Sequence, residues 1–97
     1  MPAYIIFTRL RTRYPEEVKL YAWQAPNSFV GHNVKFLARF GRCEVREGGG
    51  VEGVSILEFP SFAEATEWYE GPAYQSGSQH RYKGEDCSTI IVDGAEA

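Results

Sequence analysis

The sequence predicts a single α+β domain in which helices pack against one four-stranded antiparallel sheet. Two segments, residues 3–10 and 54–59, alternate with a period of two and carry apolar residues on both faces, as central strands do. Two other segments carry apolar residues at helical spacing between start and stop signals. A run of glycines at residues 48–50 joins two predicted strands directly and indicates a hairpin.

The N-terminal part is expected to form a strand and then a helix. Residues 3–10 are the first strand. The helix begins at Tyr14, because proline and acidic residues at positions 15–17 suit a first helical turn. Pro26 and Asn27 end it. Its predicted buried face is Val18, Tyr21, Ala22 and Ala25, and the residues expected to pack at its exit are Phe29 and Val30.

A second strand is predicted over residues 33–40. Strict alternation places Lys35, Leu37 and Arg39 on one face, and the opposite face then carries Val34, Phe36, Ala38 and Phe40. Gly41 indicates a bulge or bend. Residues 42–46 are expected to continue the strand with three charges on one face, as an edge or dimer-facing segment would.

The C-terminal half is expected to form a strand, a helix, a short second helix and a last strand. Pro60 ends the strand of residues 54–59, and a capping box of Ser61 and Glu64 starts a helix at about Phe62. Its predicted buried face is Phe62, Ala65 and Tyr69, with Trp68 beside it. The Gly71-Pro72 pair stops this helix and begins a short, weak one that carries Tyr74. Residues 88–92 are the last strand, and residues 92–97 are expected to close the chain as a polar tail.

The order βαββαβ, with one extra short helix, is the split βαβ or ferredoxin-like arrangement. Right-handed crossovers then give the spatial strand order 4-1-3-2. The first and third strands lie in the middle of that order, and they are the two that are apolar on both faces. Residues 1–97 are expected to form one domain, because a chain of this length leaves no room for a second core.

Composition disfavours several classes of function. The net charge is −3 and the basic residues are scattered, so nucleic-acid binding is not expected. No apolar run approaches the roughly 20 residues of a membrane span, and the N-terminus lacks the basic region of a signal peptide, which favours the cytoplasm. Cys43 and Cys87 are compatible with a disulfide, but free buried thiols are the favoured interpretation. These cysteines and the two histidines, His32 and His80, lack metal-ligand spacing, so neither a metal nor a cofactor is expected.

Strand directions suggest a ligand pocket at one end of the sheet. Arg9, Arg39 and Glu52 gather there, and Tyr74, His80 and Arg81 can approach. Arg39, Tyr74 and Arg81 form the main pocket hypothesis, because arginine matches carboxylates and tyrosine offers an apolar wall with a hydroxyl. Arg9 and Tyr69 complete the ligand-binding candidates. In the alternative interpretation these arginines pair with Glu52, Glu85 or a partner subunit's acids, and Tyr69 and Trp68 only pack.

Glu58 and His32 are weak catalytic candidates at the opposite end. Glu58 interrupts an otherwise apolar face of an inner strand, and burial raises the pKa of a carboxyl group towards acid–base use. His32 is its partner if it lies nearby. Alternatively, Glu58 caps a neighbouring helix or meets a basic residue across an interface.

The segment LEFPSFAEATEWYEGPAYQ resembles the signature of a small bacterial family, the domain of unknown function numbered thirteen-thirty, whose members carry an EFPS…A…WY.SP.Y pattern. The resemblance extends over AYIIFTRLR, GHNVKFLARFG, EGGGVEG and IIVDG, and departs from the family at Gly71 and at His32-Asn33. It implies a dimeric α+β barrel, in which two sheets face one another with the helices outside. Relatives in that superfamily include cofactor-independent monooxygenases, lyases, isomerases and haem enzymes, but this family has no agreed activity and implies no catalytic residue.

Two functional hypotheses follow. In the first, the protein binds or acts on a small organic acid or aromatic metabolite without a cofactor. In the second, it is a non-catalytic homodimeric structural or interaction module. A roomy, polar-lined cavity favours the first hypothesis, and a solidly packed barrel interior favours the second. Both expect a homodimer, since the predicted sheet has two apolar faces and the chain supplies helices for only one.

Overall fold

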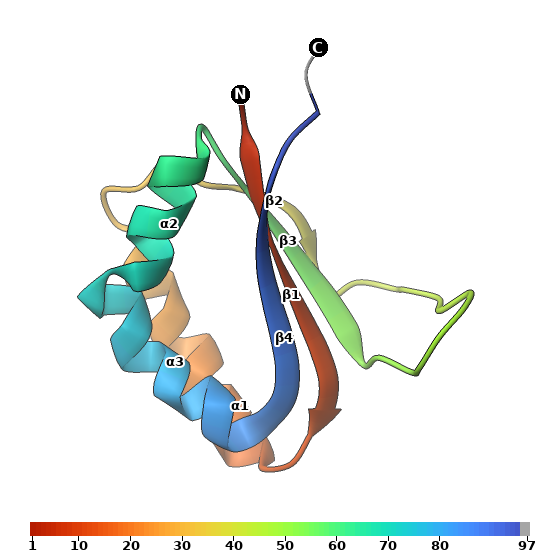
Figure 1. Ribbon diagram of the computed structural model, residues 1–97. Coiled ribbons are helices and arrows are strands. Elements are labelled where there is room, and N and C mark those ends of the chain that lie inside the picture. Colours follow the sequence, from red (N-terminus) through yellow and green to blue (C-terminus); the bar gives the residue numbers. More distant parts are fainter. Residues whose placement is uncertain (96–97) are drawn as a thin grey trace.

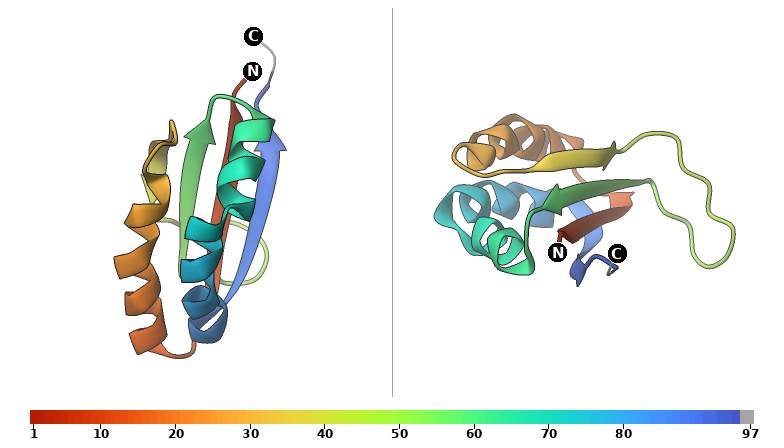
Figure 2. Two further views of the ribbon diagram at one scale, coloured as in Figure 1. Left: turned by 90° about the vertical axis from the view of Figure 1, so that its left-hand side faces the viewer. Right: turned by 90° about the horizontal axis from the view of Figure 1, so that it is seen from above.

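Four antiparallel strands form one sheet, and the helices cover one of its faces (Figures 1 and 2). The computed structural model describes residues 1–95. Along the chain the elements are β1 (Ala3–Thr12), α1 (Pro15–Gln24), the 3-10 helix η1 (Ala25–Phe29), β2 (Lys35–Arg39), β3 (Gly53–Phe59), α2 (Phe62–Glu70), α3 (Pro72–Gly84) and β4 (Glu85–Asp93). The spatial order is β2-β3-β1-β4. This order and the α+β ferredoxin-like class are as predicted.

The core lies between the helix-covered face of the sheet and α2 with α3. Alternate residues of β1 and β3 point into it, together with side chains from the two helices; its buried members are Ala3, Ile5, Phe7, Leu57, Phe59, Ala65, Trp68 and Tyr74. Trp68 is 2% exposed and packs in the core, as favoured, but it lies at the centre of the core and not beside the buried face of α2. Phe62, predicted to be buried, is exposed instead.

Helix α2 starts as the capping box predicts. The Ser61 hydroxyl accepts a hydrogen bond from the backbone N–H of Glu64 at 3.1 Å. Helix α3 is longer than predicted, because tight packing outweighs its weak intrinsic helix propensity. Its Gly77 is buried so close to α1 that an added Cβ would lie 3.4 Å from the Gln24 side chain. No helix within residues 1–95 is long and apolar enough to cross a membrane.

Strand β2 is shorter than predicted and contains a bulge. Phe36 pairs with Leu57 but Ala38 pairs with Ile56, so Leu37 is the extra residue. Phe40 then adopts a left-handed backbone conformation (φ +50°) and ends the strand. The predicted continuation through residues 42–46 is wrong, because these residues are an exposed loop that projects away from the sheet (Figure 1).

Three smaller predictions also need correction. Helix α1 has no fully buried residue, and Ala22 is exposed. Val30 is 82% exposed, although Phe29 does pack against the core. Strand β4 extends through Asp93, where its pairing with Ala3 continues the sheet, so the polar tail does not begin at residue 92. Residues 96–97 of that tail lie outside the described part of the chain.

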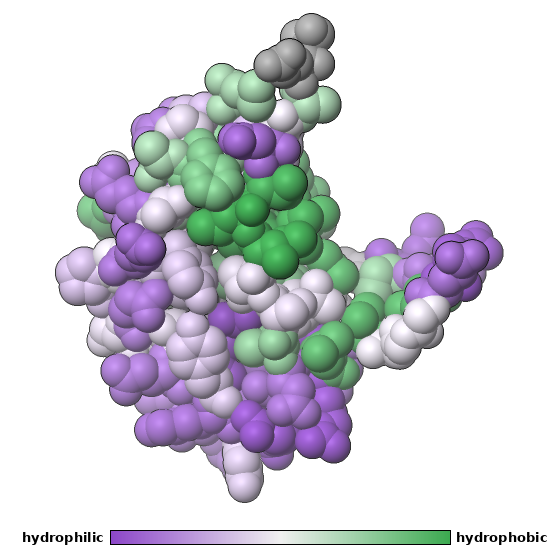
Figure 3. Space-filling view, viewed as in Figure 1, coloured by the Kyte–Doolittle hydropathy of each residue, from purple (hydrophilic) through white to green (hydrophobic). Residues whose placement is uncertain are grey.

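The opposite face of the sheet carries no helix. Register places Ile6 between Ile56 on β3 and Ile90 on β4, and these residues share the helix-free face. The other members of this face are Tyr4, Thr8, Lys35, Ala38, Val54, Glu58, Ser88 and Val92. Figure 3 looks at the β4 edge of the sheet and shows apolar side chains gathered over the upper part of that edge. We call this set the open face.

Candidate functional site

A pocket of about 410 Å³ lies between α1 with η1 and the helix-covered face of β1, β2 and β3. Most of its wall is aromatic or aliphatic. The main apolar side chains are Phe7, Phe29, Phe36, Phe40, Leu57 and Trp68. Its charged residues are Arg9, Arg39, Arg81 and Glu85. Three arginines and one glutamate give the lining a net charge of +2.

The pocket extends along the strands. Phe36 lies level with Leu57, Arg39 with Ser55, and Arg9 with Gly53. Leu57 and Gly53 are four residues apart, which is about 13 Å along a strand. One end of the pocket therefore carries Arg9, whereas the Arg39 guanidinium reaches back over the Phe36 ring at the more apolar end. Cations beside an aromatic wall suit a ligand with an apolar body and an acidic group.

The bulge at Leu37 determines where Arg39 points. Without it, Arg39 would face away from Phe36, as strict alternation predicts. With it, Arg39 pairs with Ser55 and joins Phe36 on the helix-covered face, so the predicted face of Arg39 was wrong. The Arg39 guanidinium carbon lies 3.8 Å from the centroid of the Phe36 ring. Bulges often re-aim side chains in this way.

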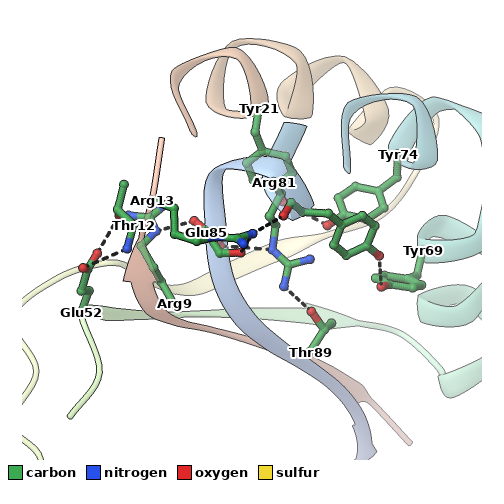
Figure 4. A network of polar contacts seen from close by, with 11 residues as sticks. Arg9, Thr12, Arg13, Tyr21, Glu52, Tyr69, Tyr74, Arg81, Glu85 and Thr89 are labelled. Atoms are coloured by element: carbon green, nitrogen blue, oxygen red, sulfur yellow. Dashed lines mark hydrogen bonds and ion pairs between the residues drawn. The ribbon is translucent and has the colours of Figure 1, made fainter. Parts of the chain in front are cut away.

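Glu85 holds two arginines at the Arg9 end of the pocket (Figure 4). Its Oε2 lies 2.6 Å from Nε of Arg9, and its Oε1 lies 3.4 Å from Nε of Arg81. The Arg81 Nη2 donates a hydrogen bond to the hydroxyl of Thr89 at 2.5 Å. Glu85 and Arg81 are both almost fully buried. Arg9, Arg39 and Arg81 therefore line one pocket. The alternative of pairing with Glu85 holds for Arg81, and Arg9 pairs with Glu85 as well.

Phe40 closes the Arg9 end of the pocket on the side of the projecting loop. The guanidinium carbon of Arg9 lies 4.4 Å from the centroid of its ring. Gly53 allows this ring to lie against β3, since a Cβ at that position would come within 2.8 Å of the ring. Arg9 is thus held between an aromatic ring and a carboxylate.

The tyrosine candidates form a layer behind the pocket. Tyr74 is buried, and its hydroxyl lies 3.1 Å from that of Tyr21, which does line the pocket. Burial raises the pKa of Tyr74 strongly and also raises that of Tyr21. Tyr69 bonds Tyr82 through its hydroxyl, and burial raises the pKa of Tyr69 to about 12. Neither Tyr74 nor Tyr69 is part of the pocket wall, so both are support rather than contact residues.

The remaining candidates lie elsewhere. Glu58 is on the open face, level with Tyr4 and Lys35, and the structure shows no hydrogen bond between it and His32 within residues 1–95. The Nδ1 atom of His80 lies 2.6 Å from Oε2 of Glu17 and links α3 to α1 outside the pocket. Glu52 accepts hydrogen bonds from Thr12, which lower the pKa of its carboxyl group.

Both cysteines are free thiols, as predicted. Cys43 is exposed on the projecting loop, so its prediction as a buried thiol was wrong. Cys87 is partly buried, and burial raises its pKa. The pKa shift disfavours the thiolate that a nucleophile would need.

Sequence reasoning missed the aromatic walls of the pocket and the central role of Glu85. Tyr21 was expected in the core, because its helical spacing cannot distinguish a packed face from a pocket face. One available signal was the spacing of Arg81 and Glu85, since residues four apart meet at the end of a helix. The residues that face the pocket from β2 depend on a bulge, for which the chain carries no clear local signal.

Comparisons with known proteins agree with this fold. A family model described as "Domain of unknown function (DUF1330)" matches residues 2–95. The RPA0582 protein of unknown function from Rhodopseudomonas palustris is similar at a TM-score of 0.69 and 21% identity, over 99% of this chain and 84% of that one. A dimeric ferredoxin-like protein of unknown function from Thermobifida fusca gives a TM-score of 0.63 and 12% identity, over 94% and 89% of the two chains.

SnoaB, described as a cofactor-independent oxygenase from Streptomyces nogalater, is similar at a TM-score of 0.61 and 9% identity. The similarity covers 99% of this chain and 94% of SnoaB. At these identities the solved structures establish a shared fold. No curated protein matches the chain.

Proposed function

The chain belongs to the DUF1330 family of unknown function, and we propose that it binds a small organic acid with an aromatic or apolar body in the pocket beside η1. The supporting observation is the combination of an aromatic wall with a net positive charge in one cavity. A volume of 410 Å³ lies within the range of about 300–1,000 Å³ that is usual for small-molecule sites. The proposal invokes no cofactor.

The aromatic wall and the arginines contribute differently to binding. Contact of a ring with Phe29, Phe36 and Trp68 removes apolar surface from water, which stabilises the complex by about 25 cal/mol per Å². The arginines contribute charge-assisted hydrogen bonds, worth about 1.5–3 kcal/mol each. Arg39 provides orientation, because its planar fork fits a carboxylate.

We propose a binding function for this pocket. SnoaB is described as an oxygenase without a cofactor, and its fold is similar, but 9% identity transfers no residue role. The pocket wall contains one carboxylate, Glu85, and both of its oxygens already contact arginines. The Tyr21 hydroxyl stays protonated near neutral pH, because burial raises its pKa.

A thermal-shift screen with matched acids and amides tests the binding proposal. We expect stabilising compounds to be carboxylates with apolar bodies, while their neutral amides are inactive because the arginines gain no charged partner. Ala22→Trp fills the pocket from the exposed side of α1 and should abolish the shifts. Lys19→Trp, an exposed change on the same helix, should leave them intact. The proposal would be overturned if the shifts persisted in Ala22→Trp or if the amides were as active as the acids. It would also be overturned if no acid shifted the melting temperature.

We also infer a homodimer in which the open faces of two copies meet. Ile90, on the edge strand β4, belongs to this face and is 56% exposed in the single chain, and exposed apolar patches of this kind mark interfaces. The similar protein from Thermobifida fusca is described as dimeric. A pair would carry a charge of −6, twice −3, which is modest for its size. The alternative function, a module for association alone, rests on this same face but does not account for the pocket.

Sedimentation at micromolar concentration tests the dimer. We expect a mass of twice 10.9 kDa for the native chain and a single-chain mass for Ile90→Glu, because each copy would then have to bury a carboxylate in an apolar interface. Val30→Glu is the matched control, since Val30 is exposed but lies beyond η1, away from the open face. A monomer mass for the native chain would contradict the inference.

A further inference from the structure

We propose that the ligand of this pocket carries two acidic groups, held by two separate positive centres. This inference rests on the proposed function and narrows its ligand class to apolar-bodied dianions. One centre is Arg39 on β2. The other, which we call the Glu85 triad, comprises Arg9, Arg81 and Glu85.

Arg39 lines the pocket as an exposed cation without an internal counter-charge among the described residues. Within residues 1–95 its guanidinium forms no ion pair, and its one close partner is the ring of Phe36. An aromatic ring attracts a cation without neutralising it. An anion that binds there therefore displaces no internal carboxylate.

The Glu85 triad carries a second excess positive charge, because two arginines share one carboxylate. Arg81 is only 2% exposed, and its Nη1 is buried without a hydrogen-bond partner in the described part of the chain. Buried like charges are costly unless a counter-charge compensates them. Glu52, a further carboxylate near Arg9, is exposed and already engaged by Thr12, so solvent screens its effect on Arg9.

The two centres lie on different strands. Arg39 is on β2 and Arg9 is on β1, with β3 between them. Two strand spacings separate their backbones by roughly 10 Å. Phe40, whose ring lies against Arg9, follows Arg39 directly in the chain. One small carboxylate is poorly placed to neutralise both centres, whereas a ring with two acidic substituents is suited to do so.

Isothermal titration at fixed low salt tests this inference with pairs of ring compounds that differ in one group. The pairs are terephthalate with 4-methylbenzoate, and isophthalate with 3-methylbenzoate. We expect the diacid of at least one pair to bind about tenfold more tightly or better, since one added charged contact is worth about 1.4 kcal/mol or more. In Arg39→Gln the ratio of the diacid's affinity to the monoacid's affinity should fall to about one, because only one positive centre remains.

Two variants separate a charge effect from a general disturbance. Arg39→Lys should keep part of the diacid preference, because the charge persists although the planar fork is lost. Lys35→Gln removes a cation from the same strand, but from a residue level with Glu58 on the open face, and should leave the preference unchanged.

The outcomes also separate this inference from the proposed function. If the monoacids bind as tightly as the diacids, the dianion inference is overturned while binding of organic acids stands. A diacid preference that survives Arg39→Gln also overturns it. If no acid binds, both fail together.

Discussion

Replacing Trp68 by alanine is expected to lower the free energy of unfolding by about 3–5 kcal/mol, the usual cost of deleting a buried tryptophan. The Trp68 ring meets five other aromatic rings: Phe7, Phe29, Phe59, Tyr69 and Tyr74. Its indole N–H also donates a hydrogen bond to the buried Ser28 hydroxyl at 3.1 Å. A domain of this size has a total stability of only about 5–15 kcal/mol, so the variant should be near its threshold of folding.

The other tryptophan provides the control. Trp23 is 75% exposed on α1, and its replacement by alanine should change stability by no more than about 0.5 kcal/mol. Urea denaturation followed by circular dichroism measures both variants at the same protein concentration. Equal losses for the two tryptophans would show that Trp68 is not the centre of the core.

Much of the fold could be predicted because local and global signals agree. The capping box of Ser61 and Glu64, the Gly71-Pro72 break and the apolar alternation of β1 and β3 all indicate the same elements. Helix α3 was underestimated because Gly77 and Ser78 have weak propensity and gain their stability from close packing. Helix propensity describes only the local sequence, so it cannot predict the contact between α3 and α1.

The site could be predicted only in part, and the bulge shows why. The three arginines were expected near one end of the sheet from strand direction alone. The extra residue at Leu37 moves the following side chains of β2 to the opposite face of the sheet. Arg39 therefore faces the pocket only because of this register shift. Tyr74 and Tyr69 were expected at the ligand because their type suits a pocket wall. They lie outside the pocket wall, where their rings meet at a tilt of 36° with centroids 5.2 Å apart.

Glu85→Gln is expected to lower the free energy of unfolding by about 3–5 kcal/mol, because it leaves two arginines of the Glu85 triad without their carboxylate. The loss should fall towards the lower end of that range, since the Arg9 side chain is 21% exposed and water can solvate it. Glutamine keeps the shape of the side chain, so the effect reports charge rather than a cavity. Thermal and urea unfolding measure it.

Glu44→Gln is the matched control for this change. Glu44 pairs with Arg46 at 3.5 Å on the projecting loop, where both side chains are mostly exposed, and such pairs contribute about 0–1 kcal/mol. A loss in Glu85→Gln no larger than in Glu44→Gln would contradict a structural role for the Glu85 triad.

The same substitution should have the opposite effect on binding. Removing Glu85 raises the net charge of the pocket lining from +2 to +3, since three arginines then remain without a carboxylate. A dicarboxylate should therefore raise the Tm of Glu85→Gln by more than it raises that of the native chain, because ligand binding to the folded state adds stability by mass action. Glu85 therefore has two opposite effects: it stabilises the fold, and it weakens the binding of an anion. The neutral glutamine should lose stability and gain affinity. An equal or smaller ligand-induced shift in Glu85→Gln would place the acidic group away from Arg9 and Arg81.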